Sequence, residues 1–156
     1  MKPHPQIAAL FALSVMLCAS CRTAPPLPPA YFSSPNWRVR QGQAVWKPSK
    51  NRPELAGDLL LATNANGNYV IQFSKTPFTL AAAQVADGAW QIEFGNARHS
   101  WSGRGAPPAR FAWFQLPRSL AANEPGRPWI FTRQADDSWR LENTRTGEML
   151  EVVFFP

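Results

Sequence analysis

Residues 55–75 read LAGDLLLATNANGNYVIQFSK and contain two strand-like runs around a tight-turn signal. The turn signal is Asn66-Gly67, which favours a β-hairpin because both residue types tolerate a positive φ. Side chains of a strand alternate between its two faces, so every second residue after the turn shares a face. We therefore expect an antiparallel hairpin that turns three side chains toward a core: Tyr69, Ile71 and Phe73.

The next segment continues the pattern toward the C-terminus. Thr76-Pro77 interrupts the chain, because Pro lacks a backbone N–H and disfavours helix before it, and a strand is then expected from Phe78 to Ala86. Asp87-Gly88 predicts a second tight turn, which leads into residues 89–94. This last strand should point Trp90, Ile92 and Phe94 inward and Gln91 and Glu93 outward.

Strand patterns also flank this central region. Residues 37–46 alternate so that the apolar Trp37, Val39 and Val45 share one face, opposite Arg38 and Arg40, which is the pattern of a half-buried strand. Strands are expected at 129–133, 138–143 and 149–155, with turns at Asp136-Asp137 and Thr146-Gly147. Residues 95–108 should be mostly loop, with a short strand at 99–102. The total is seven or eight antiparallel strands.

One helix is expected within this β-rich chain, over residues 109–122. It is entered through Pro107-Pro108, and Ala109, Trp113, Leu116 and Leu120 recur at helical spacing. Pro117 should kink or restart it. Strand remains the alternative for 109–116, because Phe111 and Trp113 also alternate. The fold class is mainly β: a curved antiparallel sheet or incomplete, half-open β-barrel with one or two short helices.

The N-terminus resembles an export signal. Lys2 and His4 precede the apolar run 7–17. As a helix this run would be about 16 Å long, which is too short to span a bilayer, because a spanning helix needs roughly 20 residues. Leu17-Cys18-Ala19-Ser20-Cys21 resembles the lipobox of bacterial lipoproteins, and this implies cleavage before Cys21 and lipid attachment to it. Plain secretion and an uncleaved anchor are the alternatives.

Three regions follow from these signals. Residues 1–20 form the lipoprotein signal peptide, 21–36 the lipidated Cys and a Pro-rich tether, and 37–156 one β domain. Fully extended, the tether would reach about 40 Å. The only cysteines are Cys18 and Cys21, so no intramolecular disulfide joins the rest of the chain.

The charge is +6 over 156 residues. This charge indicates either a solvated, mildly basic surface or a surface that attracts anionic lipid headgroups. Nucleic acid is not expected as a partner of an exported chain.

The search for catalytic chemistry finds no recognisable motif. His99 is the one histidine after the signal segment, and it lies in a polar region. Asp136-Asp137 is better explained by a turn than by a metal. Glu93 and Glu148 have no evident carboxylate partner. We expect no enzyme activity, no cofactor and no metal site.

The supply of large aromatics is the remaining feature, with 7 Trp and 10 Phe. They serve either as an ordinary packed core or as the lining of a cavity for an apolar ligand.

The order of elements resembles the LolA/LolB family of bacterial lipoprotein carriers and outer-membrane receptors, whose fold is an unclosed antiparallel barrel covered by short helices. The resemblance loosely covers residues 37–153. The stretches that carry it are Trp37-Arg38-Val39-Arg40 with Gln43-Ala44-Val45, Thr76-Pro77-Phe78, residues 109–120 with Trp113, and residues 146–152. The chain departs from the family in being shorter, and in having Thr79 rather than Gly after Phe78.

This resemblance implies a lipid-anchored protein of the outer membrane that faces the periplasm and takes part in lipoprotein localisation. Its partners would be membrane lipid, acylated lipoproteins and a periplasmic carrier protein. Pro77 and Phe78 would form a protruding apolar loop. The implied acyl-chain cavity comprises Tyr69, Ile71, Phe73, Trp90, Ile92, Phe94, Trp113 and Leu116. The alternative is a structural or interaction lipoprotein of the cell envelope with a filled core.

Overall fold

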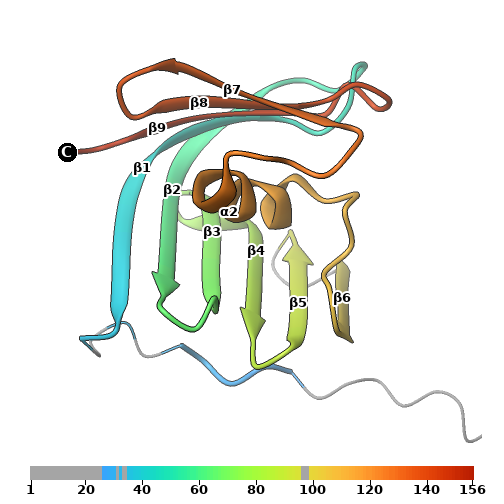
Figure 1. Cartoon of the computed structure of the whole chain (residues 1–156). Coiled ribbons are helices and arrows are strands. Elements are labelled where there is room, and N and C mark those ends of the chain that lie inside the picture. Colours follow the sequence, from blue (N-terminus) through green and yellow to red (C-terminus); the bar gives the residue numbers. More distant parts are fainter. Residues whose placement is uncertain (1–25, 31, 33–34, 96–98) are drawn as a thin grey trace, which may run out of the picture.

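The computed structural model describes residues 26–30, 32, 35–95 and 99–156. The expected signal peptide and Cys21 lie outside these residues. Nine strands and one helix are found among them (Figure 1). The strands are β1 (Trp37–Lys47), β2 (Leu55–Asn64), β3 (Tyr69–Lys75), β4 (Phe78–Ala86), β5 (Ala89–Phe94), β6 (His99–Arg104), β7 (Trp129–Ala135), β8 (Ser138–Asn143) and β9 (Met149–Phe154), and the helix is α2 (Ala112–Ala122).

All nine strands belong to one antiparallel sheet in the order β6-β5-β4-β3-β2-β1-β9-β8-β7. The outer strands β6 and β7 do not pair, so the sheet is not closed. Figure 1 shows β3–β6 as one wall and β7–β9 as another, with the long strands β1 and β2 curving between them and α2 lying inside the curve. The prediction of a mainly β, incompletely closed fold around a helix is confirmed.

The expected turns also form. Asp87 and Gly88 have φ values of 51° and 73°, as a two-residue hairpin turn requires, and Gly67 has φ 79°. The Asn64 side chain stabilises the β2–β3 turn, because its Oδ1 accepts hydrogen bonds of 3.0 Å from the backbone N–H groups of Asn66 and Asn68. The register of the central hairpins is therefore set by local chemistry.

Strand β6 differs from the expectation of a mostly looped region at 95–108. It extends from His99 to Arg104 and pairs along its length with β5, which makes nine strands rather than seven or eight. Its sequence, HSWSGR, carries almost no apolar alternation because β6 is an edge strand and its side chains are largely exposed. The hydrophobic period was therefore too weak to predict its full length.

The inward face of β1 was assigned wrongly. Val39 is 43% exposed, whereas Ala44 is buried and Trp46 packs against the core. The face of Trp37, Val39 and Val45 thus points away from the concave side of the sheet. Arg40 explains the error, because a charged residue is expected on the outer face of a strand. Arg40 instead occupies an inward position without burying its charge, and its guanidinium lies 3.9 Å from the centroid of the Phe154 ring.

Helix is the correct assignment for the 109–122 segment from Ala112 onward. The chain is helical through Pro117, which is buried, and stops at Asn123 in the left-handed conformation, φ 56°. Every residue from Ala112 to Pro117 is buried, as expected for a helix enclosed by the sheet on more than one side. No helix among the described residues is long and apolar enough to cross a membrane.

The Pro-rich segment contacts the domain on the outer side of the sheet. The backbone N–H of Leu27 donates to Gln91 Oε1 at 2.9 Å, and Gln84 Nε2 donates to the carbonyl oxygen of Pro28, also at 2.9 Å. Gln84 and Gln91 are paired neighbours on β4 and β5. Figure 1 shows this segment, in blue, passing below the ends of the strands toward β1.

Candidate functional site

The concave face of the sheet brings together the eight residues predicted to line a cavity. Tyr69, Ile71 and Phe73 are buried on β3, and Ile92 is buried on β5 between the half-buried Trp90 and Phe94. Trp113 and Leu116 of α2 are buried against them. All eight belong to one hydrophobic cluster or pack against it, so their proximity was correctly predicted from strand and helix periodicity.

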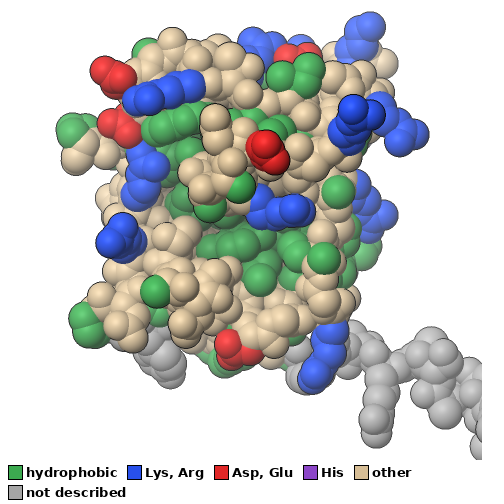
Figure 2. All heavy atoms as spheres, viewed as in Figure 1, with side chains coloured by type: hydrophobic (Ala, Val, Ile, Leu, Met, Phe, Trp, Pro, Cys, Tyr) green, Lys and Arg blue, Asp and Glu red, His purple; other side chains and the backbone are tan. Residues whose placement is uncertain are grey.

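Trp46 of β1 is the centre of this face. Its ring lies 5.3 Å from Trp113 and 6.3 Å from Phe73, in edge contacts, and stacks on Phe94 at 5.7 Å. Trp113 in turn stacks on Phe73 at 5.3 Å. Sequence reasoning missed Trp46 because the β1 face was assigned wrongly. Figure 2 shows apolar side chains around and below α2, with a basic side chain lying across them and other Lys and Arg side chains toward the periphery.

Helix α2 fills the concave side in this structure. The side chains of the six sheet residues pack on one another and on Trp113 and Leu116 of the helix, in one hydrophobic cluster. Access to this face therefore requires α2, or the residues that lead into it, to move.

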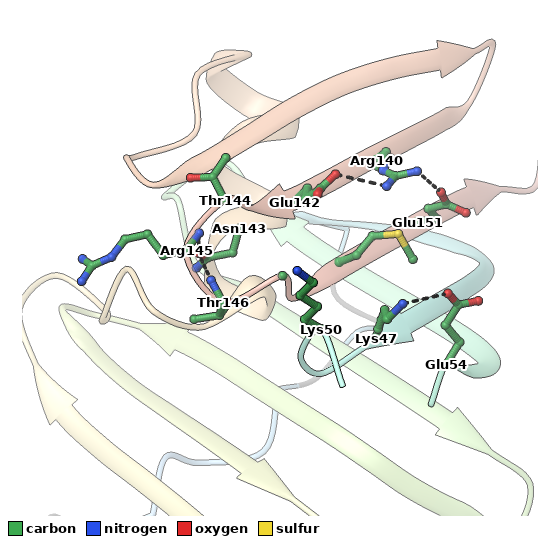
Figure 3. Close-up of a pocket in the computed structure, with 12 residues that line it drawn as sticks. Lys47, Lys50, Glu54, Arg140, Glu142, Asn143, Thr144, Arg145, Thr146 and Glu151 are labelled. Atoms are coloured by element: carbon green, nitrogen blue, oxygen red, sulfur yellow. Dashed lines mark hydrogen bonds and ion pairs between the residues drawn. The ribbon is translucent and has the colours of Figure 1, made fainter. Parts of the chain in front are cut away.

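A pocket lies elsewhere, at the end of the sheet where β1, β8 and β9 meet (Figure 3). Its volume is about 620 Å³. Arg140 pairs there with Glu142 at 3.1 Å and Glu151 at 3.0 Å, and Lys47 pairs with Glu54 at 3.6 Å. This lining of mutually neutralising charges does not suit an acyl chain.

Glu148 connects α2 to the sheet. Its carboxylate accepts a hydrogen bond from Trp46 Nε1, at 3.1 Å, and another from the backbone N–H of Ala112, the first residue of the helix. Burial raises the pKa of Glu148 to about 7, although both hydrogen bonds act in the opposite direction. The helix has no side-chain cap of its own and no acid in its first turn, so Glu148 supplies the missing cap from a distant strand end.

Glu148 was missed because its partners are N–H donors rather than a second carboxylate. A Glu beside a turn gives no signal of a contact that spans 102 residues.

Other polar groups around α2 are incompletely bonded. Trp113 Nε1, Gln115 Nε2 and Ser119 Oγ are buried and have no hydrogen-bond partner among the described residues. The hydroxyl of Tyr69 donates to the carbonyl oxygen of Phe114 at 3.4 Å. Burial raises the pKa of Tyr69, while the positive charge of Arg118 lowers it. The helix thus sits among groups whose hydrogen-bonding capacity is only partly used.

Phe78 lies at the start of β4, directly after Thr76-Pro77, and its side chain is 57% exposed. As Pro77 predicts, the strand is interrupted at these two residues, which form the tight turn between β3 and β4, and the flanking Lys75 and Phe78 pair with each other. An exposed aromatic is thus presented beside a strand connection.

Among the described residues there is no group of three His, Cys, Asp or Glu side chains placed to hold a metal ion. His99 lies on β6, where its ring stacks on Trp101 at 6.4 Å. No protein-family model and no curated protein sequence matches the chain. The fold therefore defines a class, an open antiparallel β-sheet wrapped around one helix, and the function is argued from the site.

Proposed function

We propose that this protein is an outer-membrane-anchored lipoprotein that binds lipid, or the acyl chains of other lipoproteins, on the concave face of its sheet beneath α2. The function is LolB-like lipoprotein localisation at the periplasmic side of the membrane. Partners would be membrane lipid, acylated lipoproteins and a periplasmic carrier. The observation that carries the proposal is the exposure of Phe78.

Full burial of a Phe side chain stabilises a fold by roughly 1.5–3 kcal/mol. A protein whose role is purely structural gains by tucking such a residue into its core, and Phe78 could turn inward because it begins a strand at a chain corner. It is instead 57% exposed. Exposure of this kind favours contact with an acyl chain or a lipid surface.

The concave face supports the same proposal through its composition. Aromatic rings from β1, β3 and β5 face α2, and an acyl chain could replace the helix against them without exposing this surface to water. Three buried polar atoms around α2 lack partners among the described residues, and each such atom weakens the closed packing by about 1–3 kcal/mol. Movement of α2 is correspondingly less unfavourable.

A second candidate is a structural or interaction lipoprotein with a filled core. It is favoured by the packing of α2, with its Trp113 and Leu116, against the other six predicted cavity residues. The two functions differ in whether Phe78 and the concave face take up lipid.

The test compares Phe78→Glu with Phe155→Glu, a matched variant at a Phe of similar exposure, 54%. Both variants should melt within a few degrees of the parent. Only Phe78→Glu should weaken transfer of a fluorescent lipopeptide to the protein or its insertion into liposomes. Equal transfer by both variants and the parent would favour the filled-core candidate, and a large loss of stability in Phe78→Glu alone would show that Phe78 has a core role.

A further inference from the structure

A second group of aromatic rings links the open edge of the sheet to the centre of the concave face. Phe94, Trp101 and Phe111 lie 5.6–6.0 Å apart, ring centroid to ring centroid. Phe94 also stacks on Trp46, which contacts Trp113. The rings therefore form a continuous series from Trp101, which is 40% exposed on edge strand β6, to the interior beneath α2.

Aromatic rings make contact between this edge and the start of α2. No hydrogen bond among the described residues joins β5 or β6 to residues 106–122. The opposite side of α2 is different, because Trp129 Nε1 donates to the carbonyl oxygen of Ala109 and the N–H of Gly126 donates to Gln115 Oε1. As far as the described residues show, separating β6 from the start of α2 breaks no hydrogen bond, whereas separation on the β7 side breaks two.

Phe111 lies where the start of α2 contacts β5 and β6. It is the N-cap residue of α2, with extended backbone angles of φ −101° and ψ 123°, and its ring is only half-buried between Phe94, Trp101 and Phe114. Rotation of this one ring would remove its contacts with both Phe94 and Trp101.

A positively charged side chain lies beside Phe111. The guanidinium of Arg110 lies 4.7 Å from the centroid of the Phe111 ring, and the side chain is exposed. Among the described residues no carboxylate pairs with it. An anionic head such as a phosphodiester would find a free cation beside the aromatic series.

We propose that the junction between β6 and the start of α2 is the entrance by which an acyl chain with an anionic head reaches the concave face. Phe111 and Trp101 form its gate, and Arg110 contacts the head. This inference rests on the proposed function and adds the route and the charge of the ligand.

The first test locates the bound chain by ¹⁹F NMR. The exported chain carrying Cys21→Ser is labelled with fluorotryptophan, its resonances are assigned by single Trp→Phe variants, and myristoyl-lysophosphatidylglycerol is added below its micellar concentration. The resonances of Trp46, Trp101 and Trp113 should shift, while those of Trp37 and Trp139, which lie outside the series, should not. Uptake of a fluorescent lysolipid is measured in parallel.

Two outcomes separate the inference from the proposed function. Lysolipid uptake with no shift at Trp46, Trp101 or Trp113 would overturn the proposed entrance and leave lipid binding standing. Absence of uptake in both measurements would refute lipid binding itself.

The second test measures the gate and the head contact. Phe111→Ala and Trp101→Ala should each speed lysolipid association at least about threefold, and Phe131→Ala, at a half-buried Phe on the opposite edge strand, should not. Arg110→Gln should weaken binding of the anionic lysolipid about threefold to tenfold and leave its phosphocholine analogue unchanged, with Arg118→Gln as the control. Equal rates in all three aromatic variants would overturn the gate, and equal loss for both headgroups would overturn the role of Arg110.

Discussion

Trp46 and Glu148 form a hydrogen bond of 3.1 Å that joins β1 to the residue just before β9, and the same carboxylate caps the first residue of α2. One acidic side chain therefore holds the helix against the most central ring of the concave face. Because the carboxylate is partly buried, its protonation state affects the stability of the fold.

Stability should fall as the pH rises from about 4.5 to about 7. Burial raises the pKa of Glu148 from 4.5 to about 7, so in this range the folded chain binds more protons at this site than the unfolded chain does. Glu148→Gln keeps an oxygen for both donors and should remove this part of the pH dependence. Denaturant unfolding at pH 5 and pH 8 measures it, and an identical pH slope in parent and variant would contradict the assignment.

Glu148→Ala provides the contrast to the Gln variant. It leaves the Trp46 indole and the Ala112 N–H without their acceptor and should lower stability by about 1–3 kcal/mol at pH 5. A Gln variant as unstable as the Ala variant would mean that the carboxylate has partners an amide cannot replace.

Gly103 and Trp90 should show strong energetic coupling. A Cβ added at Gly103 would lie 2.6 Å from Trp90 Cζ2, because β6 passes directly beside this ring. Gly103→Ala should cost about 1–3 kcal/mol by overpacking, and much less in a Trp90→Ala background. Additive effects in this double-mutant cycle would show that the ring can move aside.

Ser119→Ala should raise stability by up to about 1 kcal/mol. The hydroxyl is fully buried on α2 without a partner among the described residues, so its removal relieves a desolvation penalty at little loss of packing. Thermal unfolding of the two proteins is the measurement. A clear loss of stability would indicate that the hydroxyl makes a hydrogen bond in solution.

Cys21→Ser should release the protein from the membrane or leave it unprocessed, since the preceding Leu17-Cys18-Ala19-Ser20 resembles a lipobox. Incorporation of labelled palmitate, followed by membrane fractionation, checks this. Equal labelling of the parent and the variant would rule out Cys21 as the attachment site.

The regular parts of the fold could be predicted from local signals. The turns at Asn66-Gly67 and Asp87-Gly88 carry residues that accept a positive φ, and the alternation of Trp90, Ile92 and Phe94 is clear. The predictions for β1 and β6 were less successful. Alternation shows which residues share a face but not which face is inward, and an edge strand such as β6 needs no apolar alternation at all.

The candidate site divides in the same way. The predicted cavity residues lie on elements with clear periodicity, so their proximity could be predicted. Trp46, Glu148 and the contact between Phe111 and Trp101 depend on how the sheet bends around α2, which brings distant segments together. No short window of sequence contains that bend.

The sheet contains only one pairing between strands that are not consecutive in the chain, that of β1 with β9. The other seven pairings are between successive strands, so β1–β6 and β7–β9 can each assemble from neighbouring segments at a small entropic cost of loop closure. We expect the β1–β9 pairing, which must bring together residues about a hundred positions apart, to limit the folding rate. The strand pair that holds the two walls together is then also the kinetic bottleneck of the chain, and substitutions there should slow folding more than equally destabilising ones within either meander.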